Sequence, residues 1–172
     1  MIAGMVSLAA CGGGDEKKAD QPTEEKKADT TATTEKKADE PATAPAGDAV
    51  TLEITANDIM QYDKKELRAK AGQKVTLTLH HAGKLAKENM GHNLVILKPG
   101  VDITAFAMKA IDAKAHDYFP ESEAANVIAH TKLIGGGEST TIEFTAPAAG
   151  KYPFFCSFPG HFGLMKGEFI VE

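Results

Sequence analysis

Three metal-binding side chains of different chemistry lie close together in the stretch Cys156-Ser157-Phe158-Pro159-Gly160-His161-Phe162-Gly163-Leu164-Met165. Their spacing is Cys-x4-His-x3-Met, and Pro159-Gly160 favours a sharp turn that brings the cysteine and the histidine to one point. One cysteine, two histidines and a distant axial thioether are the ligand set of a blue-copper electron-transfer centre. The second histidine must come from an upstream strand, and His92 in Met90-Gly91-His92-Asn93 is the natural candidate.

Two other interpretations of the same residues compete with this one. A lone buried cysteine often serves as a small hydrophobe, and a methionine near a chain end is usually a core residue. The methionine spacing, the turn and the aromatic strand Tyr152-Pro153-Phe154-Phe155 favour a metal site instead. A structural zinc site prefers four thiolate or imidazole ligands, so a thioether suits zinc poorly. The donor set therefore favours copper.

Length and charge limit the classes of protein to which the chain can belong. Its 172 residues suffice for one ordinary domain and a tail. The formal net charge is −5, with 24 acidic and 19 basic residues, so no basic surface for nucleic acid is expected. If Cys156 binds metal and Cys11 is modified, the two cysteines leave no intramolecular disulfide.

The first eleven positions read as the end of an export signal. An apolar run finishes in small residues, as in the cleavage region of a signal peptide. Leu8-Ala9-Ala10-Cys11 resembles the bacterial lipobox, in which the cysteine is acylated and becomes the first residue of the mature protein. A short buried helix is the alternative, since the run is too short to span a bilayer. We expect residues 1–11 to be a signal-peptide remnant that ends at a lipidated Cys11, and Gly12 resembles an outer-membrane sorting signal.

Residues 12–48 are predicted to form a disordered tether. The segment is rich in Lys, Glu, Asp, Ala, Thr and Pro, and the sequence Glu16–Asp20 recurs imperfectly at Glu25–Asp29 and Glu35–Asp39. Such a composition buries too little apolar surface to offset the entropy of ordering. As a flexible coil the segment would reach roughly 30–35 Å.

Residues 49–172 show the patterns of a β-sandwich. Apolar and polar residues alternate in Val50–Thr55, Val75–His81 and Thr140–Thr145, which is the period of a half-buried strand. Within Val75–His81 this alternation places His81 toward the core and His80 outward. About seven or eight short strands predict an all-β Greek-key sandwich with one helical insertion.

The insertion is predicted over Asp102–Ala115. Asp102 is a plausible N-cap, and the polar segment Gly83–Asn89 is expected to be a loop. An apolar stripe at helical spacing is formed by Ile103, Phe106, Ala107, Ala110 and Ile111.

Several motifs in residues 50–172 together resemble azurin, of the cupredoxin family. The matching stretches are Asn57–Tyr62, Met90–Asn93, Val127–Gly135, Phe154–His161 and Leu164–Gly167. With the lipobox and the tether, the chain resembles the lipid-anchored azurins of Gram-negative outer membranes. The resemblance implies a cupredoxin fold and one copper ion.

The resemblance also assigns roles to residues. It implies copper ligation by His92, Cys156 and His161, with Met165 as axial ligand and the Gly91 carbonyl as the opposite weak contact. Asn93 would hydrogen-bond across the ligand loops, and backbone amides near Phe158 would donate to the thiolate. His81 matches a buried histidine and His130 an exposed one. A docking patch for redox partners would surround His161, formed by Leu85, Met90, Phe158 and Leu164.

Two features depart from the family. The disulfide that usually joins its first and third strands is impossible here, and Leu94 replaces a buried tryptophan, an amino acid that the chain lacks. Neither feature is part of the predicted ligand set, so both concern stability rather than function.

The predicted function is that of a blue copper protein carrying single electrons. It is not expected to be an enzyme, because protein groups fill every coordination position. The resemblance implies c-type cytochromes, copper nitrite reductase or peroxidase-type proteins as partners, and an outer-membrane lipoprotein whose domain faces the periplasm or the cell surface. The alternatives are a copper-sequestering or copper-delivery lipoprotein and a surface interaction protein.

Overall fold

The computed structural model describes residues 47–172, with side chains from Ala49 onward. The predicted lipidation site Cys11 and the predicted tether up to residue 46 lie outside the described residues. None of the helices in the described part has the length and apolar character needed to cross a membrane.

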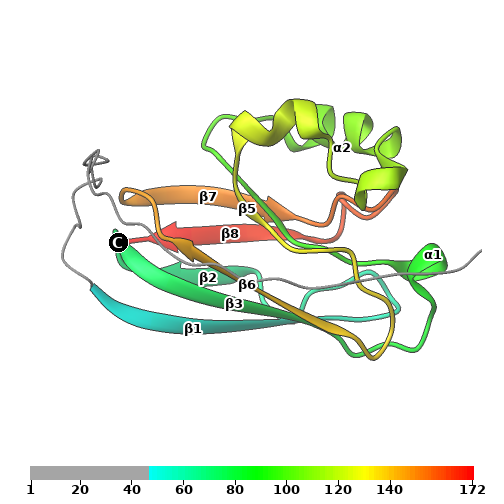
Figure 1. Cartoon of the computed structure of the whole chain (residues 1–172), viewed down its shortest axis with the longest axis horizontal. Coiled ribbons are helices and arrows are strands. Elements are labelled where there is room, and N and C mark those ends of the chain that lie inside the picture. Colours follow the sequence, from blue (N-terminus) through cyan, green and yellow to red (C-terminus); the bar gives the residue numbers. More distant parts are fainter. Residues whose placement is uncertain (1–46) are drawn as a thin grey trace, which may run out of the picture. The chain divides into compact units, whose positions relative to one another are not determined.

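Eight strands within residues 47–172 form two sheets packed face to face, which confirms the predicted β-sandwich (Figure 1). Parallel pairing joins β1 to β3 and β2 to β8, and the other pairs are antiparallel. The smaller sheet has the order β1 (Gly47–Ala56), β3 (Gln73–His81), β6 (Ser139–Thr145). The larger has the order β2 (Glu66–Ala69), β8 (Lys166–Val171), β7 (Gly150–Phe155), β4 (Val95–Leu97), β5 (Val127–His130).

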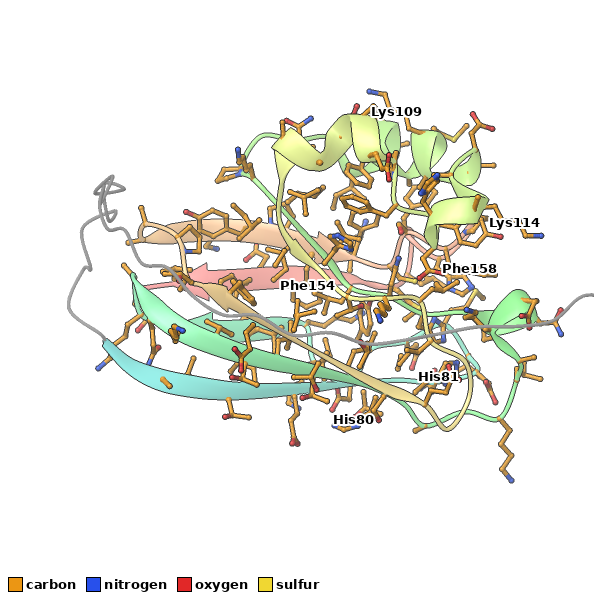
Figure 2. The ribbon with its side chains drawn as sticks, in the orientation of Figure 1. His80, His81, Lys109, Lys114, Phe154 and Phe158 are labelled. Carbon is orange, nitrogen blue, oxygen red and sulfur yellow. The ribbon has the colours of Figure 1, made fainter. Side chains whose placement is uncertain are left out.

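The main core fills the space between the sheets. In β3 the side chains of Val75, Leu77, Leu79 and His81 are all buried, as their alternation predicts. They meet side chains of the larger sheet, among them Phe154, which Figure 2 shows in the interior. Burial of these apolar surfaces is the principal force that holds the layers together.

A second, smaller core lies on the outer face of the larger sheet. Helix α2 (Ile103–Ile111) packs there through Phe106 and Ala107 against Val95, Leu97 and Phe155. Strand β4 is therefore covered on both faces, and all three of its residues are buried. This explains its continuous apolar sequence, which lacks the alternation of the other strands.

The predicted helix Asp102–Ala115 is shorter than expected. Asp102 caps it, because its Oδ1 accepts the backbone N–H groups of Thr104 (2.7 Å) and Ala105 (3.3 Å). The α-helix ends at Ile111, and a separate 3-10 turn follows at Lys114–His116. Ile111 is 45% exposed, because the contact with the sheet ends before it, so the predicted apolar stripe is wrong at this position.

The predicted loop Gly83–Asn89 is corrected in part. One helical turn, α1 (Lys87–Met90), forms at its end, directly before Gly91 and His92. A Cβ at Gly91 would lie 2.6 Å from the carbonyl oxygen of Lys87, so a glycine is required there. A second 3-10 segment, Glu121–Asn126, leads into β5.

Replacing Phe169 by alanine should destabilise the metal-free protein by about 3–5 kcal/mol. Phe169 is fully buried in the main core and contacts the rings of Phe144 and Tyr152. The matched control is Ile59→Ala, at a side chain that is 65% exposed, where a change within about 0.5 kcal/mol is expected. Chemical denaturation measures both, and equal losses would contradict this location of the core.

Candidate metal centre

Strand pairing brings the predicted ligands to one end of the sandwich. His92 precedes β4, Cys156 follows β7, and Met165 precedes β8. Because β7 is antiparallel to both neighbours, its carboxyl end lies beside the amino ends of β4 and β8. The register pairs Phe155 with both Val95 and Lys166, so the three segments end level with one another.

The segment after β7 folds back on itself and places His161 beside Cys156. The His161 N–H donates to the Phe158 carbonyl (3.1 Å), and the Met165 N–H donates to the His161 carbonyl (2.9 Å). Gly160 takes the left-handed conformation at φ +84°, as the predicted turn requires. The Cys156 N–H donates to the Met165 carbonyl (3.0 Å), which closes the loop.

Three donor atoms meet at this end of the molecule. Cys156 Sγ lies 3.6 Å from His161 Nδ1 and 3.9 Å from His92 Nδ1, and all three atoms lie within 4.8 Å of one another. A metal with bonds of about 2.3 Å to sulfur and 2.0–2.1 Å to nitrogen, as in protein zinc sites, would separate the sulfur and nitrogen atoms of a trigonal plane by about 3.8 Å. The spacing therefore fits one first-row metal ion.

Two further groups border this cluster. The Gly91 carbonyl oxygen lies 3.9 Å from Cys156 Sγ. Met165 is completely buried in the main core together with Cys156. A buried thioether and a backbone carbonyl beside two imidazoles and a thiolate match the blue-copper donor set better than a closed zinc site.

A hydrogen bond fixes the orientation of the His92 ring. Its Nε2 donates to the Asn57 carbonyl (2.8 Å), which leaves Nδ1 as the unprotonated nitrogen facing Cys156. Asn57 itself is held in a turn, since its Oδ1 accepts the N–H groups of Ile59 (3.1 Å) and Gln61 (3.2 Å). The imidazole is thus positioned for a metal in advance.

Burial keeps the three donors uncharged in the metal-free protein. It lowers the pKa of His92 and of His161 to about 4, so both imidazoles are neutral at neutral pH. Burial also raises the pKa of the Cys156 thiol to about 11, although the backbone N–H groups of Asn93 and Phe158 oppose the shift by donating to the sulfur. A metal that binds here must therefore displace the thiol proton.

Asn93 joins the two ligand-bearing loops. Its Oδ1 accepts the Ser157 N–H (2.9 Å), and its Nδ2 donates to Ser157 Oγ (2.8 Å) and to the Asp117 carbonyl (3.2 Å). The Ser157 hydroxyl donates in turn to the Tyr118 carbonyl (2.7 Å). The residues next to His92 and Cys156 are therefore tied together by buried polar contacts.

Sequence reasoning missed several residues that support the site. The buried Tyr62 hydroxyl donates to the Asn93 carbonyl, and Asn57 orients His92. Both lie more than thirty residues before their partners, so no local pattern links them. Two signals were available: Asn57 and Tyr62 bound a stretch that resembles azurin, and Ser157 directly follows Cys156.

The two remaining histidines singled out in the sequence lie where the resemblance places them. His81 is buried behind the site, with its ring 4.4 Å from that of His92, and its Nε2 bonds the Met90 carbonyl (2.8 Å). His130 is exposed and stacks on Phe119 at 3.8 Å.

The predicted docking patch is only partly exposed. Leu85 and Leu164 are 44% and 58% exposed, and Met90 is half-buried. Phe158 is buried and lies with its ring 4.7 Å from that of His161. His161 is 3% exposed, so a thin apolar cover separates it from solvent at the end of the domain where Figure 2 shows Phe158.

A family model for copper-binding proteins of the plastocyanin/azurin type matches residues 48–172. The chain belongs to the plastocyanin/azurin family. Azurin-1 of Alcaligenes xylosoxydans xylosoxydans is 46% identical over 120 residues, which cover 67% of this chain and 92% of that protein. Outer membrane protein H.8 of Neisseria meningitidis is 43% identical over 118 residues, covering 67% of this chain and 63% of that protein.

Solved structures agree with this family membership. Auracyanin A, a "blue" copper protein of Chloroflexus aurantiacus, superposes with a TM-score of 0.66 at 35% identity and covers 73% of this chain and all of its own. The predicted cupredoxin fold and the resemblance to azurin are confirmed. This plastocyanin/azurin-family protein is a blue copper electron-transfer protein with one copper ion.

The described domain shows what stands in place of the family's disulfide and of its buried tryptophan. Cys156 is a free buried thiol, and β1 and β3 are joined by parallel pairing. Leu94 is fully buried in the main core, and its N–H donates to Thr131 Oγ1 (2.9 Å).

The metal-free protein should lose stability as the pH falls from about 6.5 to about 4. The folded-state pKa of His92 and of His161 is about 4, below the ordinary value of 6.5, so only the unfolded state takes up these protons in that window. Stability is therefore complete above pH 6.5 and declines below it. Denaturation at several pH values measures the slope.

His161→Gln should flatten this pH dependence by removing one of the two groups. His130→Gln, at an exposed histidine with no ion pair in the described domain, is the matched control and should leave the slope as it is. An unchanged slope in His161→Gln would contradict the assignment.

Proposed function

We propose that His92 Nδ1, Cys156 Sγ and His161 Nδ1 hold the copper ion, with the Met165 thioether and the Gly91 carbonyl as weaker contacts. The convergence of the three donor atoms within 4.8 Å carries this assignment. The burial of Met165 and the 3.9 Å approach of the Gly91 carbonyl to the sulfur support the two weaker contacts. Copper supplies a one-electron Cu(II)/Cu(I) couple when bound.

The chain's own residues supply a site that changes little with oxidation state. Asn57 fixes the His92 ring, and Asn93 fixes the distance between the ligand loops. All three donor side chains are at most 3% exposed, so few water molecules can approach. A site with fixed ligands and little solvent suits electron transfer, and five protein groups leave no position for a substrate.

Electrons would leave through the edge of His161. Phe158 packs against this ring, and Leu164 and Leu85 are exposed around it. A small apolar surface suits brief encounters with redox proteins. The proposed partners are c-type cytochromes, copper nitrite reductase or peroxidase-type proteins.

Copper sequestration or delivery is the weaker proposal. A delivery protein needs ligands that can exchange at the surface, whereas Cys156 and Met165 are both completely buried here. The same burial argues against a purely adhesive surface protein, which has no need for a preformed donor cluster.

Cys156→Ser tests the ligand assignment. A thiolate on Cu(II) in a trigonal site gives an intense charge-transfer band and a blue colour. Serine keeps the size of the side chain but removes the soft donor, so the visible band of the copper-loaded protein should disappear while the circular dichroism of the sandwich is retained. Cys11→Ala is the matched control and should stay blue; a blue Cys156→Ser protein would refute the assignment.

We further propose that Cys11 is lipidated and that residues 12–48 tether the domain to the outer membrane. Leu8-Ala9-Ala10-Cys11 and the polar composition of the following segment support this proposal. So does the similarity of the domain to Outer membrane protein H.8 of Neisseria meningitidis. Several acyl chains on one cysteine anchor a protein stably, whereas a single chain binds only marginally.

Cys11→Ala should move the protein from the membrane fraction to the soluble fraction without changing its visible spectrum. Fractionation of cells producing the full chain, followed by absorption spectroscopy of both fractions, measures the two properties separately. Cys11→Ala protein that remains with the membrane would rule out the lipid anchor.

A further inference from the structure

A set of exposed lysines lies on the segments around the docking patch. These rim lysines are Lys65, Lys84, Lys87, Lys114, Lys132 and Lys166. None of them forms an ion pair within residues 47–172, and neither do Lys70, Lys74 and Lys98 elsewhere in this part of the chain. Within the described domain, the ammonium groups of the rim lysines are therefore not held in direct ion pairs.

Contacts place the rim lysines beside the patch from different sides. Lys65 Nζ donates to the Leu164 carbonyl (3.0 Å), which fixes one ammonium group at the edge of the patch. Lys84 flanks Leu85 directly in the sequence, and Lys87 begins helix α1 two residues later. Figure 1 shows α1 at the same end of the sandwich at which Figure 2 shows Phe158.

The positions of the other three rim lysines follow from their neighbours in the structure. Lys132 lines the same surface hollow as Lys87. Lys166 follows Met165 and pairs with Phe155 in the register of β7 and β8. Lys114 begins the 3-10 turn Lys114–His116, which leads to Tyr118, whose ring lies 5.1 Å from that of Phe158.

Three carboxylates at this end accept hydrogen bonds from the protein's own backbone. Asp58 accepts the N–H groups of Lys84 (2.7 Å) and Leu85 (3.3 Å), and Glu138 accepts that of Gly135 (2.7 Å). Asp117 accepts the Leu133 N–H (3.4 Å). Their fields are partly offset by these N–H dipoles, which leaves Glu88, Asp112 and Glu121 as exposed carboxylates with no such contact in the described domain.

We propose that the rim lysines steer an acidic protein surface onto the apolar patch, so that the electron-transfer partner is recognised by negative charge around its own redox centre. This inference rests on the proposed function of the patch. The whole chain carries a net charge of −5, but charges farther away than the screening length of about 8 Å count little at contact. Local complementarity sets the association rate and the choice of partner.

A protein partner fits the surface better than an anionic membrane. The rim lysines lie beside the patch in which Phe158 packs on His161, so binding there would place the partner's redox centre next to the proposed electron exit. Only Leu85 and Leu164 are large exposed apolar side chains of the patch, whereas membrane-surface binding scales with buried apolar area.

Reduction of the full copper-loaded chain by two small reagents of opposite charge tests the proposal. The rate with the anionic iron(II)–EDTA complex should fall about threefold to tenfold as ionic strength rises from about 10 mM to about 500 mM. The rate with cationic hexaammineruthenium(II) should rise over the same range. Salt dependence of the same sign for both reagents would overturn the proposal.

Charge-reversal variants test whether the rim lysines, rather than the net charge, set the rate of reduction by iron(II)–EDTA. Lys84→Glu with Lys87→Glu should lower the low-salt rate with iron(II)–EDTA about threefold to tenfold. Lys74→Glu with Lys98→Glu changes the net charge equally at exposed positions, one at the start of β3 and one after β4, both far from the ligand loops. This control should leave the rate nearly unchanged, and equal effects of the two pairs would exclude local steering.

A measurement on the metal-free full chain separates this inference from the proposed function. Soluble poly-L-glutamate should bind at low salt, and the Lys84→Glu, Lys87→Glu variant should bind it about tenfold more weakly than the Lys74→Glu, Lys98→Glu control. A colourless copper-loaded protein would refute the function while this binding persists. Rim-dependent binding to vesicles containing anionic lipid, with no rim effect on reduction by iron(II)–EDTA, would overturn the proposal in favour of a membrane contact.

Discussion

The donor cluster exists because two loops, distant in sequence, are held together by the hydrogen bonds between Asn93 and Ser157. A buried thiol and two buried imidazole nitrogens that face one another are costly to desolvate and gain little from mutual contact. Such an arrangement persists only if the surrounding structure imposes it. Asn93 meets this need because its side-chain amide hydrogen-bonds to Ser157 on the other loop. The Tyr62 hydroxyl in turn donates to the backbone carbonyl of Asn93.

The larger sheet also restricts the positions of the ligand segments. Cys156 follows the central strand β7, whose two antiparallel neighbours begin just after His92 and Met165. Helix α2 covers the outer face of β4 and β7, and the smaller sheet covers the inner face. The ligands therefore lie at the end of a strand set packed on both sides, where backbone movement is most restricted.

His161 is the donor that is buried and yet lies close to the surface, where electrons would pass to a partner. The ring is almost completely covered, yet only Phe158 and the exposed Leu164 and Leu85 separate it from solvent. Of the lysines without ion pairs in the described domain, six lie around this thin apolar cover, and only Lys70, Lys74 and Lys98 lie elsewhere. The distribution of charge thus distinguishes the ligand end from the rest of the domain more clearly than the net charge does.

The sequence by itself determined the metal, the fold class and most of the proposed donor set. Thiolate, imidazole and thioether chemistry is a property of residue types, and the alternation in Val75–His81 follows from the geometry of a strand. These signals are local, so they can be recognised from the sequence alone. The helical stripe failed at Ile111 because the extent of contact with the sheet, which no local pattern contains, decides where the buried face ends.

Only the tertiary structure decided how the site is held and how its surface is charged. The contacts of Asn57 with His92 and of Tyr62 with Asn93 span more than thirty residues, and each depends on which strands become neighbours. The rim lysines are scattered through the sequence from Lys65 to Lys166, and the placement of the loops and short helical turns between the strands gathers them. Long-range pairing is set by the packing of the whole domain, which is why neither feature could be inferred from residue spacing.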